Sequence, residues 1–359
     1  MLKVLVAAHE VANALTRWHE FIKMGNVAKS EQLKEEVEYL LTDMEKNQDV
    51  LLYYSLIDYR HSLLCHNTNE SEEKLQNIDP HHEMNDLLLY YYYYFKGMHQ
   101  YKLQNYQEAL SYYNQAEMSL ENLSDEIEKS EFYYKVASAY YHMRQFLLAI
   151  DYTFKAISIY QNYPLYKSRI ADCHNVLGLC YLGRKEYEKA EKHFKESFEA
   201  AKEIGDKDLQ VFLMYNLGYL YSEQNQSDLA IQFLTEVAAK KFRLHKVCYL
   251  LAKEFFKKGD RKLAYLHISK GKEICQEINN EEYFHHLKVL ELLDSPPQQL
   301  LKRAAFQMNK VLDYFQEEGL HGFVHDYAIE FGNLLYKYQY YENASHFYNR
   351  GVNCQTSKS

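Results

Sequence analysis

Histidines are the first side chains in this sequence whose chemistry suggests a metal or proton-transfer site. The chain holds 17 of them, but a zinc site needs three or four converging ligands at short, regular spacings. The histidine groups are instead scattered: His81-His82, His285-His286, the neighbours His61, Cys65 and His66, and a His9-Glu10 pair without the second histidine of a zinc protease. We therefore expect no metal site in this chain.

Motifs of self-contained enzymes are absent from the sequence as well. It has no Gly-x-Ser-x-Gly, no Walker loop and no dinucleotide fingerprint. Only 12 of the 359 residues are Gly and 4 are Pro, well below the usual shares of about 7% and about 5%. This composition argues against a β-sandwich or a Gly-rich phosphate loop and favours an all-α protein.

A run of aromatic residues, Tyr90 to Phe95, could be a platform on which nucleic-acid bases stack. Only Lys96 and Lys102 lie nearby, and the net charge is −9 with a pI near 6. A nucleic-acid binder needs a basic surface for the phosphates. We therefore expect these rings to pack between helices, and we expect no nucleic-acid partner.

Internal repetition is the strongest signal for the fold. A column of alanines recurs at intervals of 40, 41, 40, 34, 40 and 40 residues: Ala109, Ala149, Ala190, Ala230, Ala264, Ala304 and Ala344. Small residues precede them at the spacing of tetratricopeptide hairpins, such as Gly97, Gly178, Gly218 and Gly332. The pattern predicts a superhelix of about seven tetratricopeptide repeats over residues 86–359.

Residues 1–66 do not fit the repeat and predict a three-helix bundle. Val11, Leu15, Trp18 and Ile22 are spaced as on one helix face, and Gly25-Asn26 is a plausible end for that helix. An acidic second helix follows, and the third is expected to begin at Asp49 as its cap. The polar stretch 67–85 reads as a linker or hinge.

Two sequence blocks connect this architecture to a known family. The first is Gln48-Asp49-Val50-Leu51-Leu52-Tyr53-Tyr54, and the second runs from Tyr91 to Tyr141 (YYYYFKGMHQY…SEFYYKVASAYY). With the repeats downstream, the chain resembles the Rap family, the response-regulator aspartate phosphatases of Bacillus-type bacteria. The resemblance covers nearly the whole chain. It implies a protein that docks on a phosphorylated response regulator of the sporulation phosphorelay and hydrolyses its aspartyl phosphate.

The resemblance also implies a role for Gln48, which matches the family's catalytic glutamine at a corner between bundle helices. A side-chain amide both donates and accepts hydrogen bonds, so it can orient a water molecule towards phosphorus. The regulator would supply the aspartate and the magnesium, so this chain needs no cofactor of its own. Leu51 and Tyr59, eight residues apart on the third helix, are candidates to dock the regulator, with a core role as the alternative.

Members of the family are switched by short secreted peptides that re-enter the cell and bind the repeats. Asn216 matches a peptide-binding asparagine of the family, and Asp172 and Asn175 are further candidates. The chain departs from the family in its third repeat, where Cys180 and Gly183 stand in place of an Asn and an Asp. That loss puts regulation by a pentapeptide in doubt, or implies a different peptide.

Other functions remain open. A member without catalysis could sequester a response regulator, such as a competence-type transcription factor, and block its DNA binding. A peptide-binding transcriptional regulator is less well supported, because residues 29–49 are acidic where a basic DNA-recognition helix would lie. The N-terminal stretch is too short and polar for a signal peptide, no apolar run reaches 18 residues, and the six Cys form no Cys-x-x-Cys pair. These features predict a cytoplasmic protein without a membrane partner.

Overall fold

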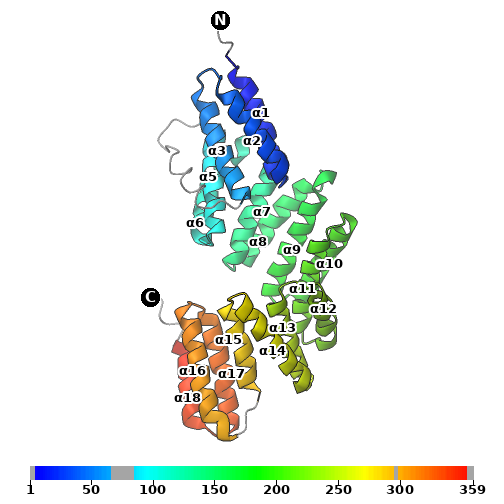
Figure 1. Ribbon diagram of the computed structural model, residues 1–359, viewed down its shortest axis with the longest axis vertical. Helices are drawn as coiled ribbons and strands as arrows, with labels where there is room; N and C mark the ends of the chain where they lie inside the picture. Colours follow the sequence, from blue (N-terminus) through cyan, green and yellow to red (C-terminus); the bar gives the residue numbers. More distant parts are fainter. Residues whose placement is uncertain (1–4, 66–84, 295–297, 354–359) are drawn as a thin grey trace. The chain divides into compact units, whose positions relative to one another are not determined.

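The computed structural model describes residues 5–65, 85–294 and 298–353 (Figure 1). The chain divides into two units, Met1–Glu186 and Tyr187–Ser359. The regular secondary structure of the described residues is helical, apart from one isolated parallel bridge between Val6 and Met44. The all-α prediction is therefore confirmed.

Three helices open unit 1: α1 (Ala8–Lys23), α2 (Val27–Leu41) and α3 (Gln48–Leu64). The four residues expected on one face of α1 are all buried in the bundle core: Val11, Leu15, Trp18 and Ile22. Gly25 has a φ of +71°, a left-handed conformation that favours glycine, and the side chain of Asn26 then caps α2 by accepting from the N–H of Lys29. The predicted stop after the first helix is confirmed.

The other helices of unit 1 form hairpins of the repeat array. They are α5 (Asp86–Lys102), α6 (Tyr106–Glu117), α7 (Glu126–His142), α8 (Phe146–Tyr160) and α9 (Lys167–Gly183), with short 3₁₀ turns at Leu120–Asn122 and Pro164–Tyr166. Residue 85 caps α5 through its Asn side chain, and the rest of the predicted 67–85 linker lies outside the described residues. The predicted boundaries between bundle, linker and repeats stay predictions.

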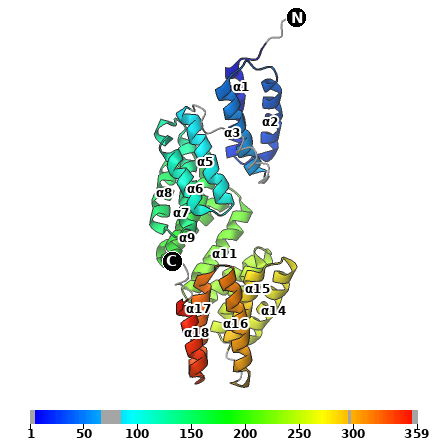
Figure 2. The ribbon, with the colours of Figure 1, turned by 90° about the vertical axis from the view of Figure 1, so that its left-hand side faces the viewer.

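Unit 2 continues the repeats. Its helices are α10 (Tyr187–Glu203), α11 (Lys207–Glu223), α12 (Ser227–Ala239), α13 (Leu244–Lys257), α14 (Arg261–Glu277), α15 (Glu281–Leu293), α16 (Leu301–Glu317), α17 (His321–Lys337) and α18 (Tyr341–Asn353), with a 3₁₀ turn at Gln298–Leu300. Consecutive helices from α15 to α18 pack side by side (Figure 2).

The alanine column lies in the core of the hairpins, since all seven alanines are buried. Gly97, Gly218 and Gly332, each twelve residues before one of these alanines, have no room for a side chain. A Cβ on Gly97 would lie 2.4 Å from the Tyr113 ring, and one on Gly332 would lie 2.7 Å from the Tyr348 ring. Each of these pairs is sixteen residues apart in sequence. The spacing thus marks where the two helices of a hairpin meet, and the repeat prediction is confirmed.

The aromatic run on α5 is buried where the bundle meets the first repeats. Tyr90, Tyr91, Tyr94 and Phe95 lie in one continuous core with Trp18 of α1, and α3 packs beside α5 (Figure 2). Tyr91 and Phe95 both contact the ring of His19 edge-on. The packing role expected for these rings is confirmed, and they offer no surface for bases to stack on.

Candidate functional site

The corner between α2 and α3 is held in place by the segment that precedes α1. The N–H of Val6 donates to the carbonyl of Asp43 at 2.8 Å, and the N–H of Glu45 donates to the carbonyl of Val6 at 3.0 Å. The Glu45 carboxylate also accepts from the N–H of Ala8 at 2.9 Å, which places it at the start of α1. Backbone hydrogen bonds of Asp43 and Glu45 to Val6 therefore hold the loop that leads into α3.

Gln48 is the first residue of α3, and its side chain is exposed at this corner. Asn47, not the predicted Asp49, caps the helix by accepting from the N–H of Val50 at 3.1 Å. Asn47 takes the capping position because its backbone is extended, whereas Asp49 already lies in the first turn. Among the described residues, the Gln48 amide has no hydrogen-bond partner. It is therefore available to a water molecule or a docked protein.

The two predicted docking residues have different surroundings. Leu51 lies one turn after Gln48 and is 42% exposed, so it can contact a partner. Tyr59 is fully buried, and its hydroxyl donates to the carbonyl of Phe95 at 3.3 Å. The docking role predicted for Tyr59 is therefore wrong, and the core role considered as its alternative is correct. The reason is that α3 is covered by the repeats as well as by its own bundle.

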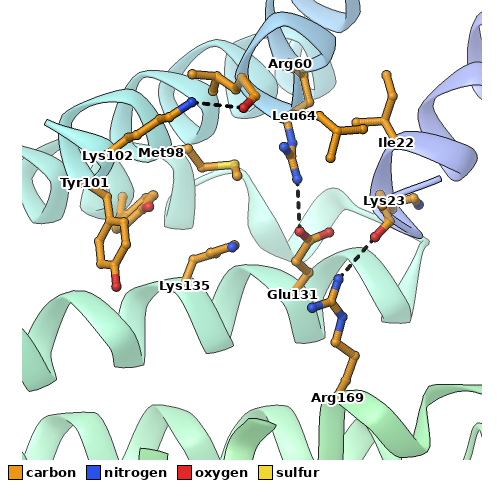
Figure 3. A pocket seen from close by; sticks show the side chains of 13 residues that line it. Ile22, Lys23, Arg60, Leu64, Met98, Tyr101, Lys102, Glu131, Lys135 and Arg169 are labelled. Atoms are coloured by element: carbon orange, nitrogen blue, oxygen red, sulfur yellow. Dashed lines mark hydrogen bonds and ion pairs between the residues drawn. The ribbon is translucent and has the colours of Figure 1, made fainter. Parts of the chain in front are cut away.

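Ion pairs that are wholly or partly buried join the bundle to the first repeats. Lys23 at the end of α1 lies 2.8 Å from a carboxylate oxygen of Asp125 and 3.2 Å from one of Glu128. The guanidinium of Arg60 on α3 lies 3.2 Å from the Glu131 carboxylate of α7 (Figure 3). Both side chains of the second pair are nearly inaccessible to solvent. These contacts couple the position of the Gln48 corner to the repeat array.

Burial shifts the protonation equilibria of the first group. Desolvation raises the pKa of Glu128 above its ordinary value, although the nearby Lys23 ammonium opposes that shift. Burial alone would lower the pKa of Lys23, but the Glu128 and Asp125 carboxylates outweigh it and raise that pKa well above its usual range. Lys23 is thus charged in the folded state, and Glu128 is easier to protonate than an exposed glutamate.

The Glu128 shift predicts how stability depends on pH. A carboxyl group whose pKa is raised by folding binds its proton more tightly in the folded state. Its stabilising contribution is complete below its unfolded pKa, about 4.3, and is lost as pH rises through its folded pKa. We expect the free energy of unfolding to fall less between about pH 5 and about pH 8 in Glu128→Gln than in the parent. Urea titrations across this range, with the exposed Glu35→Gln as control, measure the difference; equal slopes in all three proteins would contradict it.

A second candidate site lies in unit 2, on the first helices of successive repeats. A cavity of about 540 Å³ opens between α11, α13, α15 and α17. Its wall is rich in aromatic rings: Tyr215, Tyr219, Tyr249, Tyr283, Phe323 and Tyr327. The Tyr327 hydroxyl lies 2.6 Å from Nδ1 of His286 and 3.5 Å from the Tyr249 hydroxyl. These hydrogen bonds hold the wall together.

Charged groups line the rim of this cavity. Lys253 lies 3.2 Å from the Glu223 carboxylate, so these two charges are paired. Asp326 and Glu330, one turn apart on α17, form no ion pair within the described parts of the chain. The cavity therefore presents aromatic surface and two unpaired carboxylates. Sequence reasoning missed this cavity. Its signal was the recurrence of tyrosines and charged residues four positions apart on a lining helix, as in Tyr215, Tyr219 and Glu223.

The predicted peptide-binding residues are distributed over both units. Asn216 lies on α11 in unit 2 and is 3% exposed, beside the helix face that lines the cavity. Asp172 and Asn175 lie half-buried on α9 in unit 1, where Asp172 is 3.4 Å from the Arg169 guanidinium. Their peptide-binding roles stay predictions.

The two residues that depart from the family are explained by packing. Cys180 is buried in a small core that includes Ala149 and Val176, with Phe146 beside it. A Cβ on Gly183 would lie 2.5 Å from the Phe146 ring. Both positions thus accommodate the start of α8, which leaves no place for longer polar side chains.

No helix in the described part of the chain is long and apolar enough to span a membrane.

Known protein families match both the bundle and the repeats of this chain. Residues 5–66 match the family model described as response regulator aspartate phosphatase H, N terminal, and residues 128–203 and 170–239 match a tetratricopeptide-repeat model. The chain is 31% identical to response regulator aspartate phosphatase I of Bacillus subtilis, over 92% of this chain and 88% of that protein. The chain belongs to the Rap family.

Two further Rap relatives bear on function. Regulatory protein RapK of Bacillus subtilis is 33% identical over 79% of this chain and 80% of its own. The crystal structure of a Rap protein complexed with competence and sporulation factor has a TM-score of 0.76 and 28% identity, covering 97% of this chain and 98% of that one. The Rap resemblance inferred from residues 48–54 and 91–141 is confirmed.

Proposed function

We propose that this Rap protein docks on a phosphorylated response regulator and promotes hydrolysis of the aspartyl phosphate. The observation that carries the proposal is the exposed, unpartnered Gln48 amide at a corner fixed by backbone hydrogen bonds. Membership of a family whose relatives are named response regulator aspartate phosphatases supports it.

The chemistry requires little from this chain besides orientation. Water attacks phosphorus, the bond from phosphorus to the aspartyl oxygen breaks, and inorganic phosphate leaves as the carboxylate is restored. The Gln48 carbonyl oxygen would accept a hydrogen bond from the attacking water and hold it in line. We propose that the magnesium ion that neutralises the phosphoryl oxygens belongs to the regulator. The exposed Leu51 would contact an apolar patch of that partner.

The test is to incubate the full chain with a panel of purified phosphorylated regulators and follow both phosphate release and complex formation. Release that turns over many regulator molecules per Rap chain supports the phosphatase. No acceleration with any regulator that it binds would contradict the catalytic proposal.

A second candidate function is sequestration without catalysis. The relative RapK, 33% identical, is named a regulatory protein and not a phosphatase. In this case the chain would bind a regulator in equal amounts, release no phosphate, and block the regulator's DNA binding. The same panel distinguishes the two functions, because only sequestration depends on stoichiometric amounts of the chain.

We also propose that the aromatic cavity of unit 2 binds part of a short signalling peptide. A Rap structure complexed with a signalling factor supports this, and an aromatic cavity of about 540 Å³ has the size of typical ligand sites. The unpaired carboxylates of Asp326 and Glu330 would attract a cationic side chain of the peptide.

This proposal predicts the effect of removing one charge. Glu330→Gln should weaken binding of a Lys- or Arg-containing pentapeptide about tenfold, since a charge-assisted hydrogen bond contributes about 1.5 kcal/mol or more. A peptide with norleucine at that position should bind both proteins equally. Calorimetry measures the affinities, with the exposed Glu342→Gln on α18 as control. Equal loss of both peptides would show that the charge plays no part.

A further inference from the structure

Unit 1 contains a second cavity that neither catalysis nor peptide binding explains. It has a volume of about 350 Å³ and lies where the bundle meets the first repeats (Figure 3). Its walls come from α1 and α3 on one side and from α5, α6, α7 and α9 on the other. The apolar part of its lining includes Ile22, Leu64 and Met98. The size is that of a small-molecule site.

The lining is strongly cationic. Five basic side chains face it, against the single carboxylate of Glu131: Lys23, Arg60, Lys102, Lys135 and Arg169. Four of the five are already engaged. Lys23 and Arg60 are held in ion pairs, Lys102 donates to the carbonyl of Leu63, and Arg169 donates to the carbonyl of Lys23 (Figure 3). Their charge nevertheless acts on the cavity, because few carboxylates face it in return.

Two polar groups in the cavity wall form neither a hydrogen bond nor an ion pair among the described residues. Across the described residues, the half-buried Lys135 ammonium has no hydrogen bond and no ion pair and contacts only the face of the Tyr134 ring, at 5.8 Å. The buried Tyr113 hydroxyl has no hydrogen-bond partner among these residues. A buried polar group without a partner is unfavourable. Burial lowers the pKa of Lys135 to about 8, and the nearby Arg60 and Arg169 add to that shift while Glu131 opposes it. A negatively charged ligand would satisfy both groups at once.

We propose that this cavity binds a small organic anion. Its carboxylate or phosphate group accepts hydrogen bonds from the Lys135 ammonium and the Tyr113 hydroxyl, in the positive field of Arg60 and Arg169. Its apolar part packs on Ile22, Leu64 and Met98. Because these residues come from both the bundle and the repeats, the bound anion holds the two together. The ligand therefore acts on the element that carries Gln48 without contacting Gln48.

The experiment uses the full chain and four probes: phenyl phosphate, phenylacetate, inorganic phosphate and the neutral benzyl alcohol. Calorimetry measures affinity, and thermal unfolding measures stabilisation. We expect one or both of the aromatic anions to bind and to raise the unfolding temperature, which identifies the preferred anionic group. Inorganic phosphate should bind more weakly than phenyl phosphate, and benzyl alcohol should not bind.

Variants test the assignment to this cavity. Lys135→Met should weaken anion binding about tenfold or more, and Tyr113→Phe about fivefold. Lys155→Met, an exposed lysine on α8 of the same unit, is the matched control and should bind like the parent. Ligand-free Lys135→Met should unfold at the same or a higher temperature, because the substitution removes a half-buried charge that has no ion pair among the described residues. If this variant fails to fold, Lys135→Gln replaces it. Absence of heat with every anion, or unchanged affinity in the folded Lys135 variant, would overturn the proposal.

Discussion

Gln48→Ala is expected to slow phosphate release from a phosphorylated regulator about a hundredfold and to leave the affinity for that regulator nearly unchanged. The side chain is exposed and unpartnered among the described residues, so its loss removes nothing from the packing of the bundle. Its amide would act on the attacking water in the transition state, and interactions made only there change the rate more than the binding.

Gln48→Asn sharpens this prediction. It keeps the amide but shortens the side chain by one methylene, which withdraws the amide from the water. It should therefore resemble Gln48→Ala and not the parent. Single-turnover phosphate release and a separate binding titration measure the two effects.

The matched control is Gln32→Ala, an exposed glutamine on α2 of the same bundle, which should behave like the parent. Unchanged release in Gln48→Ala, with intact binding, would exclude the water-orienting role. Equal weakening of binding and release would instead identify Gln48 as a docking residue.

Arg60→Met is expected to lower the free energy of unfolding by about 3–5 kcal/mol, because it removes the ion-pair partner of the buried Glu131 carboxylate. The pair lies 71 residues apart in sequence and joins α3 to α7. Breaking it should therefore loosen the contact between the bundle and the repeats as well as the core. Urea unfolding followed by circular dichroism measures the loss.

The same chain offers a matched surface pair. Arg17 and Glu36 lie 2.6 Å apart within the bundle, but their side chains are 57% and 45% exposed. Arg17→Met should change stability by less than about 1 kcal/mol, because water already solvates both charges. The double variant Arg60→Met, Glu131→Met should recover part of the loss, since it also removes the carboxylate that Arg60→Met alone leaves without its ion pair. Equal effects at both arginines would show that burial does not govern the first pair.

Much of the fold was predictable because its determinants are local. Each repeat is a helical hairpin whose two helices meet at a small residue and at a side chain sixteen positions later. That spacing is visible in the sequence itself, for example in Gly97 and Tyr113. The buried face of α1 was also predictable, because the spacing of apolar residues indicates which side of a helix is buried. That face consists of Val11, Leu15, Trp18 and Ile22. Gln48 was found through resemblance, because one exposed amide has no periodic signal.

The role of Tyr59 could not be read from the same kind of pattern. Its spacing from Leu51 suits one face of a helix, but α3 is buried on several faces towards its C-terminal end, from Leu56 to Leu63. The bundle covers one side and α5 covers another. Periodicity identifies a buried face only when one side of a helix meets solvent. Of the two predicted docking residues, Leu51 is therefore the exposed one.

The sequence by itself determined the all-α class, the repeat register, the three bundle helices and the family. Each depends on residues within one hairpin or one short block. The tertiary structure decided which charges are paired and where cavities form. Lys23 forms an ion pair with Asp125, 102 residues later in the sequence, and Arg60 forms one with Glu131, 71 residues later. Lys135 and Tyr113 become unpaired neighbours of one cavity only when six helices are in place. Such properties follow from the packing of distant helices, and no local spacing encodes them.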